Sequence, residues 1–241
     1  MERLDKLVSV AAGCGRREAQ TLIRKGRVLV NGEACRAAEK RFEEDVSLIV
    51  DGREVTYRKY VYIMQNKPQG VISATENRND TRPTVVDILP EELRRPGLFP
   101  AGRLDADTTG FVLLTDDGNF AHDILTPKKH VPKRDRVGTD VAPQTDIAER
   151  FAQGLTLGDG TVCAPAEVQP VSEREFVVTL HEGMYHQIKR MFAACGAKVI
   201  SLHRFCMGNL LLDEGLLPGQ SRLITETERQ MLTQREQDAQ K

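Results

Sequence analysis

The order of its strand and helix patterns is the feature that most limits how this chain of 241 residues can fold. After residue 59, strand patterns such as "FVLLT", "EFVVTLHE" and "KVISLHRF" are mixed irregularly with helical patterns such as "TVVDILP", "NFAHDIL", "QTDIAERFAQGL" and "MYHQIKRMFAAC". A doubly wound parallel sheet requires regular alternation of strands and helices, which this order does not provide. The pattern therefore predicts an α+β fold with a mixed, mainly antiparallel sheet flanked by helices.

The first 58 residues show two short helical patterns followed by hairpins. Apolar residues recur at helical spacing in both segments, as Leu4, Leu7, Val8 and Ala11 and then as Ala19, Leu22 and Ile23. The strand pattern "RVLVNG" ends in the turn Asn31-Gly32, and "VSLIVDGREV" has Asp51-Gly52 at its centre, as in a β-hairpin. We therefore predict a small domain over residues 1–58, a larger one over 59–232 and a frayed tail over 233–241.

The formal net charge is −1, but the basic residues are unevenly placed. Five of them face a single acid in "GRREAQTLIRKGRVLVNG", and five face a single acid in "PKKHVPKRDR". The first group is Arg16, Arg17, Arg24, Lys25 and Arg27, and the second is Lys128, Lys129, Lys133, Arg134 and Arg136. Nucleic-acid binding depends on where charges lie rather than on their sum, so the two groups predict two basic patches.

Several classes of protein are disfavoured by what the sequence lacks. The five cysteines form no CxxC or Cys/His pair at zinc spacing, which favours free thiols in a reducing compartment over disulfides or a metal site. No window is apolar enough for a membrane span, and the charged N-terminus is unlike a signal peptide. A glycine-rich phosphate loop is also missing. We therefore expect a cytoplasmic protein with no membrane contact, no metal and no nucleotide cofactor.

The segment "GRLDADTTG" places two carboxylates, Asp105 and Asp107, in a polar turn before an apolar strand pattern. Such turns are common, and their aspartates often only accept backbone hydrogen bonds. However, Arg103 lies two residues from Asp105, so on an extended segment both side chains point to the same side. A cation so close would keep the carboxylate ionised and ready to act as a nucleophile.

The segment "EGMYHQIKRMFAACG" predicts a helix with one buried and one basic face. The predicted buried face is Tyr185, Ile188, Met191, Phe192 and Cys195, and the predicted basic face is His186, Lys189 and Arg190. Basic faces are often simply solvated. These donors follow Gly183 at a strand-to-helix junction, however, a position that suits contact with a phosphate backbone or a catalytic carboxylate.

Nearly the whole chain resembles known families. Residues 3–57, with "RLDKLVSVAAGCGRREAQTLIRKGRVLVNG", resemble the S4 RNA-binding domain. Residues 59–232 resemble the catalytic domain of the pseudouridine synthases that modify ribosomal RNA, through "NKPQG", "GRLDADTTGFVLLTDDG" and "EGMYHQIKRMF" in the same order. The details "YHQIKRMFAACG", "LHR" and "PGQSRLITETE" are closest to members acting on small-subunit (16S) rRNA, although members acting on 23S rRNA share much of them.

The resemblance implies an activity and residues for it. Pseudouridine synthases break the bond between ribose C1′ and uracil N1, turn the base and rejoin it through C5, without a cofactor. Asp105 matches the family's essential aspartate, Lys189 the basic residue that pairs with it, and Arg103 a position that helps to displace the target base. The residues expected to bind RNA are His186, Gln187, Arg190, Lys133 and, in the S4-like part, Arg16, Arg17, Arg24, Lys25 and Arg27. The implied partner is ribosomal RNA or a small-subunit assembly intermediate, bound by a monomer.

One position departs from the family pattern. The family has a Lys-x-Tyr element whose tyrosine stacks on the target base, whereas this chain reads "PKRDRVG", with Lys133 in place and Asp135 at the tyrosine position. An aspartate cannot stack on uracil, and a buried carboxylate near Asp105 would disfavour ionisation of both. Because the flanking residues match without a gap, either another tyrosine takes over the role or turnover is slow or absent. The candidate tyrosines are Tyr60, Tyr62 and Tyr185.

Three functions therefore compete at this stage. The leading hypothesis is isomerisation of uridine in ribosomal RNA. The second is an RNA-binding ribosome-assembly factor without chemistry, which Asp135 favours. The third is an acid-base hydrolase that uses Asp105 and Asp107, which requires both carboxylates in one cleft; their spacing alone says little about that.

Overall fold

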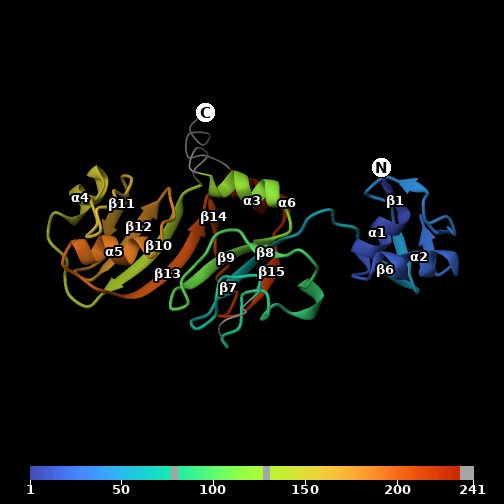
Figure 1. The fold of residues 1–241 in the computed structure, drawn as a ribbon, viewed down its shortest axis with the longest axis horizontal. Coiled ribbons are helices and arrows are strands. Elements are labelled where there is room, and N and C mark those ends of the chain that lie inside the picture. Colours follow the sequence, from blue (N-terminus) through green and yellow to red (C-terminus); the bar gives the residue numbers. More distant parts are fainter. Residues whose placement is uncertain (77–80, 127–130, 234–241) are drawn as a thin grey trace. The chain divides into compact units, whose positions relative to one another are not determined.

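The chain folds into two compact units (Figure 1). The computed structural model describes residues 1–76, 81–126 and 131–233. The first unit is Met1–Val61 and the second is Tyr62–Lys241. From residue 234 on, the predicted tail lies outside the described residues, as do Lys128 and Lys129 of the second basic group.

The first unit contains the two helices and the hairpins that the sequence predicts. Its elements are β1 (Glu2–Arg3), α1 (Leu4–Ala11), α2 (Arg16–Arg24), β2 (Val28–Val30), β3 (Glu33–Ala34), β4 (Arg41–Phe42), β5 (Leu48–Val50) and β6 (Arg53–Val55). Four strands form an antiparallel sheet in the order β3-β2-β5-β6, and the apolar residues of α1 and α2 meet it in one core. The hairpin turns contain positive φ angles, 52° at Asn31 and 53° at Asp51, each followed by a glycine, which is the chemistry such turns require.

The second unit is a long sheet with helices. Its strands are β7 (Tyr62–Lys67), β8 (Phe99–Pro100), β9 (Thr109–Thr115), β10 (Lys133–Thr139), β11 (Glu167–Pro170), β12 (Glu175–Leu180), β13 (Val199–Met207), β14 (Leu210–Leu211) and β15 (Ser221–Leu223). Its helices are the 3-10 helix η1 (Glu91–Leu93), α3 (Gly118–Leu125), α4 (Ile147–Gln153), α5 (Gln187–Ala194) and α6 (Glu226–Met231). In the described parts of the chain, no helix combines the length and apolar character needed to cross a membrane.

The sheet is mixed and mainly antiparallel, which confirms the predicted fold class. Its order is β11-β12-β10-β13-β9-β7-β15, and among these neighbours only β13 and β9 run parallel. The interior strand β10 was not among the predicted strands, because its inward positions include Lys133 and Asp135 rather than apolar residues. The segment predicted as part of a basic patch is therefore in the middle of the sheet.

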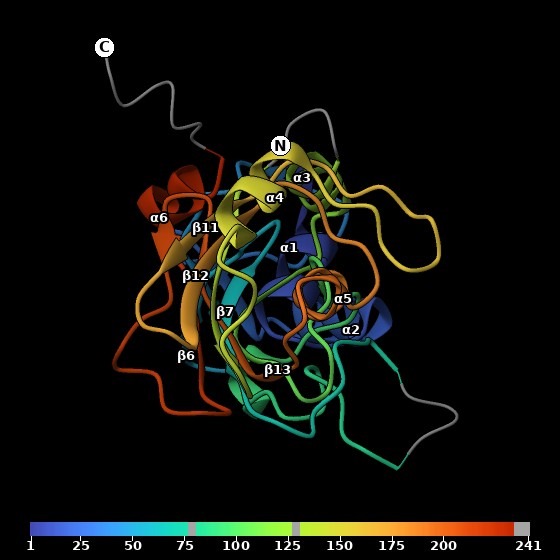
Figure 2. The ribbon, with the colours of Figure 1, turned by 90° about the vertical axis from the view of Figure 1, so that its left-hand side faces the viewer.

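Helices cover the two faces of this sheet at different places. Helices α4 and α5 pack on one face over Val137 and Leu202, whereas α3 and the end of α6 pack on the other face over Phe111 and Leu113. The register supports this division. His203 pairs with Thr109, so His203 and Phe111 point to the same face of the sheet. Leu202, the residue before His203, therefore points to the opposite face. The end-on view of Figure 2 places α5 and α6 on either side of the strands.

The helix predicted over residues 84–90 is wrong. This segment forms a single hydrogen-bonded turn, in which the Asp87 carboxylate accepts from the Thr84 amide at 2.8 Å and the Thr84 hydroxyl accepts from the Asp87 amide at 3.1 Å. Pro90 then ends the turn, because proline disfavours helical dihedrals in the residue before it. Thr84 and Asp87 make the hydrogen bonds of a helix N-terminus, but Pro90 prevents a second helical turn.

Candidate active site

The parallel pair of strands β9 and β13 brings the two predicted site segments together. The loop of residues 101–108 enters β9, and α5 precedes β13; parallel neighbours begin at the same end of a sheet. The strands approach closely at Gly110, which has a φ of 101° and where an added Cβ would lie 2.1 Å from the Arg204 carbonyl oxygen. The loop before β9 and helix α5 therefore meet at the end of the sheet at which these two strands begin.

Asp105 lies at this meeting point with the predicted partner. The Lys189 ammonium donates a hydrogen bond to Asp105 Oδ2 at 2.8 Å, and His186 Nε2 lies 3.4 Å from Asp105 Oδ1. The Asp105 side chain is 26% exposed and that of Lys189 is 23% exposed. The carboxylate is thus partly shielded but open to a ligand.

Lys189 also contacts the second carboxylate of the turn. Its ammonium lies 2.6 Å from Asp107 Oδ1, on a side chain that is 62% exposed. Burial lowers the pKa of Lys189, but hydrogen bonds to the two aspartates outweigh it and raise the pKa above its ordinary value. The hydrogen bond from Lys189 is also the main reason that the pKa of Asp107 is lowered. Lys189 therefore keeps its positive charge through neutral pH.

The Asp105 loop is supported from below by Lys67, which sequence reasoning missed. This lysine is fully buried, and its ammonium donates to the carbonyls of Ala106 at 3.3 Å, Thr108 at 2.7 Å and Pro68 at 3.1 Å. Burial lowers the pKa of Lys67 to about 8, although the two aspartates of the turn oppose the shift. The motif "NKPQG" was available as a signal, but the motif does not show that its lysine points under a distant loop.

A second contact fixes the same loop to the chain after β7. The Ser73 hydroxyl donates to the Leu104 carbonyl at 2.9 Å and accepts from the Leu104 amide at 3.0 Å. The Gly70 amide donates to the Ala106 carbonyl at 2.7 Å. Hydrogen bonds to the backbone of Leu104 and of Ala106, the residues on either side of Asp105, therefore position its carboxylate.

Helix α5 begins later than predicted and changes which side chains it buries. It starts at Gln187, because His186 adopts left-handed dihedrals with φ 49°. Tyr185 was predicted on the buried face but precedes the helix and is 72% exposed. Gln187 was predicted to line the RNA groove, yet it is buried, and its amide accepts from the Met184 backbone and donates to Glu182. These hydrogen bonds fix the loop before α5.

The two arginines predicted near the site behave differently from each other. Arg103 is exposed and forms no ion pair with Asp105 among the described residues, so the prediction that Arg103 neutralises Asp105 along the turn is wrong. The neutralising cation is Lys189, which comes from helix α5. Arg190 lies 2.5 Å from Asp159 Oδ2 and is 28% exposed, so part of its charge is already neutralised.

The departure at the family tyrosine position is a buried ion pair. The Asp135 side chain is 1% exposed and that of Arg204 is 12% exposed, with Arg204 Nε 3.2 Å from Asp135 Oδ1. Lys133, predicted to bind RNA, is also buried, and burial lowers its pKa to about 8. Both β10 side chains are therefore buried in the protein.

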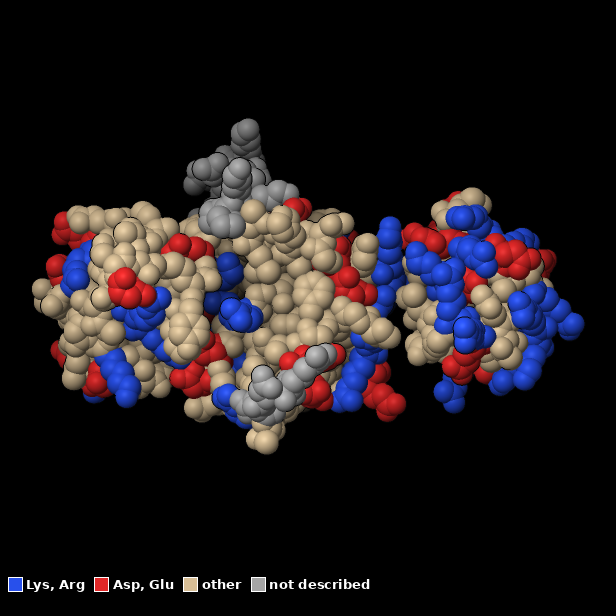
Figure 3. Space-filling model, in the orientation of Figure 1, with Lys and Arg blue, Asp and Glu red and all other residues tan. Residues whose placement is uncertain are grey.

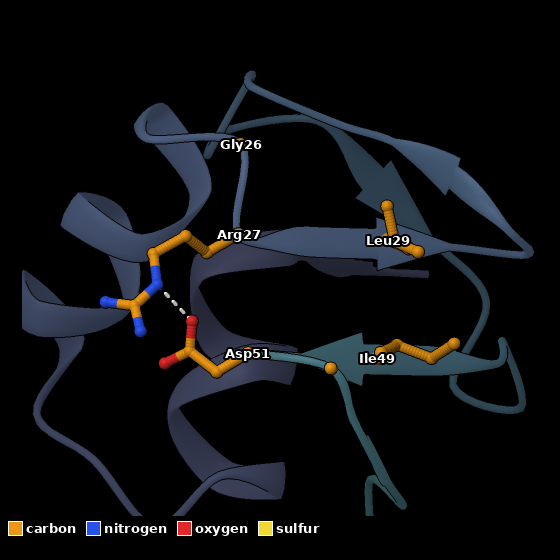
Figure 4. Close-up of a pocket in the computed structure, with 6 residues that line it drawn as sticks. Gly26, Arg27, Leu29, Ile49 and Asp51 are labelled. Atoms are coloured by element: carbon orange, nitrogen blue, oxygen red, sulfur yellow. Dashed lines mark ion pairs between the residues drawn. The ribbon is translucent and has the colours of Figure 1, made fainter.

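The basic residues of the first unit remain largely at the surface. Arg17, Arg24 and Lys25 are exposed, whereas Arg16 is paired with the buried Asp5 at 3.1 Å. Figure 3 shows Lys and Arg side chains over much of the visible face of this unit, interspersed with acidic ones. Arg27 is held by Asp51 beside a shallow depression on Leu29 and Ile49 (Figure 4). The predicted RNA-binding side chains thus lie at or near the surface of α2 and its C-terminal turn.

Comparison with known proteins agrees with both units. Residues 61–194 match the RNA pseudouridylate synthase family, and residues 2–45 match the S4 domain. The chain is 42% identical to the ribosomal small subunit pseudouridine synthase A of Vibrio cholerae over 94% of this chain and 97% of the relative. It is 40% identical to an uncharacterised RNA pseudouridine synthase of Bacillus subtilis, over 96% and 98% of the two chains.

A solved structure extends the agreement to three dimensions. A crystal structure of a pseudouridylate synthase matches with a TM-score of 0.66 and 36% identity, over 96% of this chain and the whole of that chain. With Asp105 and Lys189 paired where the three motifs converge, this chain belongs to the RNA pseudouridylate synthase family and carries an N-terminal S4 domain.

Proposed function

We propose that this pseudouridine synthase isomerises a uridine of small-subunit (16S) ribosomal RNA, using Asp105 and no cofactor. The observation that carries the proposal is the 2.8 Å contact between Asp105 and Lys189, in a loop fixed by Lys67 and Ser73. The substrate follows from relatives along nearly the whole chain that are named as small-subunit enzymes, in Vibrio cholerae and Escherichia coli.

The geometry suits chemistry at the sugar of an extruded nucleotide. Asp105 either attacks ribose C1′ or acts as a base at the ribose, and Lys189 stabilises its anion during either step. The uridine must first leave its stack, which costs on the order of a few kcal/mol. The exposed cation of Arg103 and the basic surface of the first unit offset this cost by binding the backbone.

Pseudouridine mapping tests the proposal directly. The protein is incubated separately with 16S rRNA, with 23S rRNA and with early small-subunit particles, and new pseudouridines are located by sequencing. We expect a single new site in 16S rRNA, either free or in the particle. A site in 23S rRNA alone would move the substrate to the other subunit, and no site in any sample would leave the chain without the proposed activity.

The buried Asp135 favours one alternative, an RNA-binding ribosome-assembly factor with weak or no turnover. Its carboxylate is held by Arg204 inside the protein and cannot stack on a base. Under this alternative, Asp105→Asn would restore small-subunit assembly in a deletion strain as well as the unchanged protein does. Under the proposed function, the pseudouridine disappears from that strain.

We propose that Tyr185 supplies the stacking surface that Asp135 cannot. Its ring is 72% exposed and stacks on His186 at 3.8 Å between centroids, and His186 in turn approaches Asp105. Tyr62 does not suit the role, because its hydroxyl donates to Asp117 at 2.7 Å and its ring packs against Phe120. Tyr60 lies outside the unit that carries Asp105.

Replacing this ring separates stacking from proton transfer. We expect Tyr185→Leu to reduce the single-turnover rate of pseudouridine formation by about 10- to 100-fold, since loss of base–aromatic stacking costs about 1–3 kcal/mol. Tyr185→Phe keeps the ring and should stay within about threefold of the unchanged protein. Equal rates for the leucine and phenylalanine variants would exclude stacking by Tyr185.

A further inference from the structure

A second group of basic and aromatic side chains lies away from the Asp105 site. The guanidinium carbon of Arg136 lies 5.2 Å from the centre of the Phe205 ring, and that of Arg134 lies 5.9 Å from it. Phe205 is the extra residue of a β-bulge, because Arg134 pairs with Cys206 while the next residue of β10 pairs with Arg204. The ring thus lies within cation–π distance of two cations that come from the neighbouring strand.

This cluster is on the opposite face of the sheet from α5. Along β10 alternate side chains point to opposite faces, and Val137 packs in the core beneath α5. Arg136 therefore points away from α5, and its partner in the register is His203. Lys189 belongs to α5, so the cluster and the Asp105 site are on different faces.

Among the described residues, both guanidiniums lack a carboxylate partner, unlike Arg190, Arg204 and Arg222 of the same unit. Within the described residues, neither Arg134 nor Arg136 forms an ion pair, whereas Arg204 on the adjacent strand is paired with Asp135. Arg136 is exposed, and Arg134 donates one hydrogen bond to Cys206 Sγ at 3.0 Å while its buried Nε has no partner. Two positive charges are thus held in place on a sheet face without being neutralised.

We propose that the cluster of Arg134, Phe205 and Arg136 binds the phosphate backbone of the substrate RNA as it continues beyond the Asp105 site. A guanidinium stacked on an aromatic ring keeps its N–H edge free, and that edge matches the oxygens of a phosphate. Because Phe205 already restrains both side chains, less conformational freedom is lost on binding. The inference rests on the proposed function only for the identity of the RNA.

Charge complementarity favours RNA over a protein partner. The cluster offers unpaired cations rather than a broad apolar surface, and a polyanion gains most from such a site. Each phosphate contact releases counterions, so the cluster should contribute to the salt dependence of binding.

The test compares two double variants of the full chain that remove the same charge. Arg134→Gln with Arg136→Gln removes the cluster, and Arg174→Gln with Lys198→Gln removes two exposed cations from loops as a matched control. Binding to 16S rRNA and to a short oligouridine is measured by fluorescence anisotropy over a range of salt. We expect the cluster variant to bind rRNA about tenfold more weakly, with a salt slope lower by about 1.5, and to bind oligouridine as before.

Two further readouts keep the outcome clear. Arg136→Gln alone changes an exposed side chain, so it tests the proposal even if the double variant folds poorly, with an expected loss of about threefold. Phe205→Leu keeps both positive charges but removes the aromatic ring that restrains the two arginine side chains. It should weaken rRNA binding while leaving the salt slope unchanged. The proposal is wrong if the cluster variant binds rRNA as the loop control does, or if oligouridine binding falls equally. If the unchanged protein binds rRNA but forms no pseudouridine, the proposed function fails while the binding result still stands.

Discussion

Asp105→Asn is expected to lower pseudouridine formation by about a thousandfold or more while leaving RNA affinity nearly unchanged. The substitution keeps the size of the side chain but replaces one carboxylate oxygen by an amide NH2 and removes the charge, so the side chain can neither attack the sugar nor accept a proton. The Lys189 ammonium keeps Asp107 as a partner, which limits the effect on stability. Single-turnover rates on 16S rRNA and anisotropy binding curves provide the two measurements.

Asp107→Asn is the matched control for this result. It removes a charge from the same turn and from the same lysine, but from a side chain that is 62% exposed. We expect a rate within about tenfold of the unchanged protein, since the effect acts only through Lys189. A loss as large as that of Asp105→Asn would favour a mechanism with two working carboxylates, because the structure does place both beside one ammonium.

Asp135→Leu is expected to lower the free energy of unfolding by about 3–5 kcal/mol, as measured by urea denaturation. The pair of Asp135 and Arg204 is buried, so removing one partner leaves a charge without compensation in a region of low polarity. Asp159→Leu breaks a pair with Arg190 whose acid is 60% exposed, and should cost less than about 1 kcal/mol. Equal losses in the two variants would mean that burial does not govern the cost.

The same reasoning affects any attempt to restore the family tyrosine. Asp135→Tyr alone leaves Arg204 without its carboxylate, so a loss of activity in that variant reports on folding as well as on chemistry. Combining Asp135→Tyr with Arg204→Leu removes the unpaired charge. We expect this double variant to recover part of the stability that Asp135→Tyr loses, which a double-mutant cycle measures. Pseudouridine formation by the double variant then tests the tyrosine itself.

The sequence predicted those parts of the molecule that depend on local chemistry. The turns at Asn31 and Asp51 follow from residues that tolerate positive φ next to glycine. The pairing of Asp105 with Lys189 was implied by the resemblance of the motifs to the pseudouridine synthases, and not by local chemistry. By contrast, the partner that Arg103 was expected to provide comes from another element. Spacing along the chain cannot decide between a neighbour two residues away and a lysine brought close by folding.

The failures have a common physical origin in buried polar groups and local backbone dihedrals. Strand β10 has Lys133 and Asp135 facing inward, so the apolar alternation that identifies a strand is missing. Helical spacing placed Tyr185 on a buried face, but the left-handed dihedrals of His186 delay the helix and turn that ring outward. Lys67 was overlooked because two of its three carbonyl partners, those of Ala106 and Thr108, are 39 and 41 residues away along the chain.

The close approach of the two strands at Gly110 means that the geometry of the site depends on the absence of a Cβ atom at this position. Strands β9 and β13 can lie side by side there only because no side chain stands between Gly110 and the Arg204 backbone. Any larger residue would force the strands apart, and with them the two halves of the unit that contribute the acid and its lysine. Alanine at this single position would therefore separate Asp105 from Lys189 without changing either side chain.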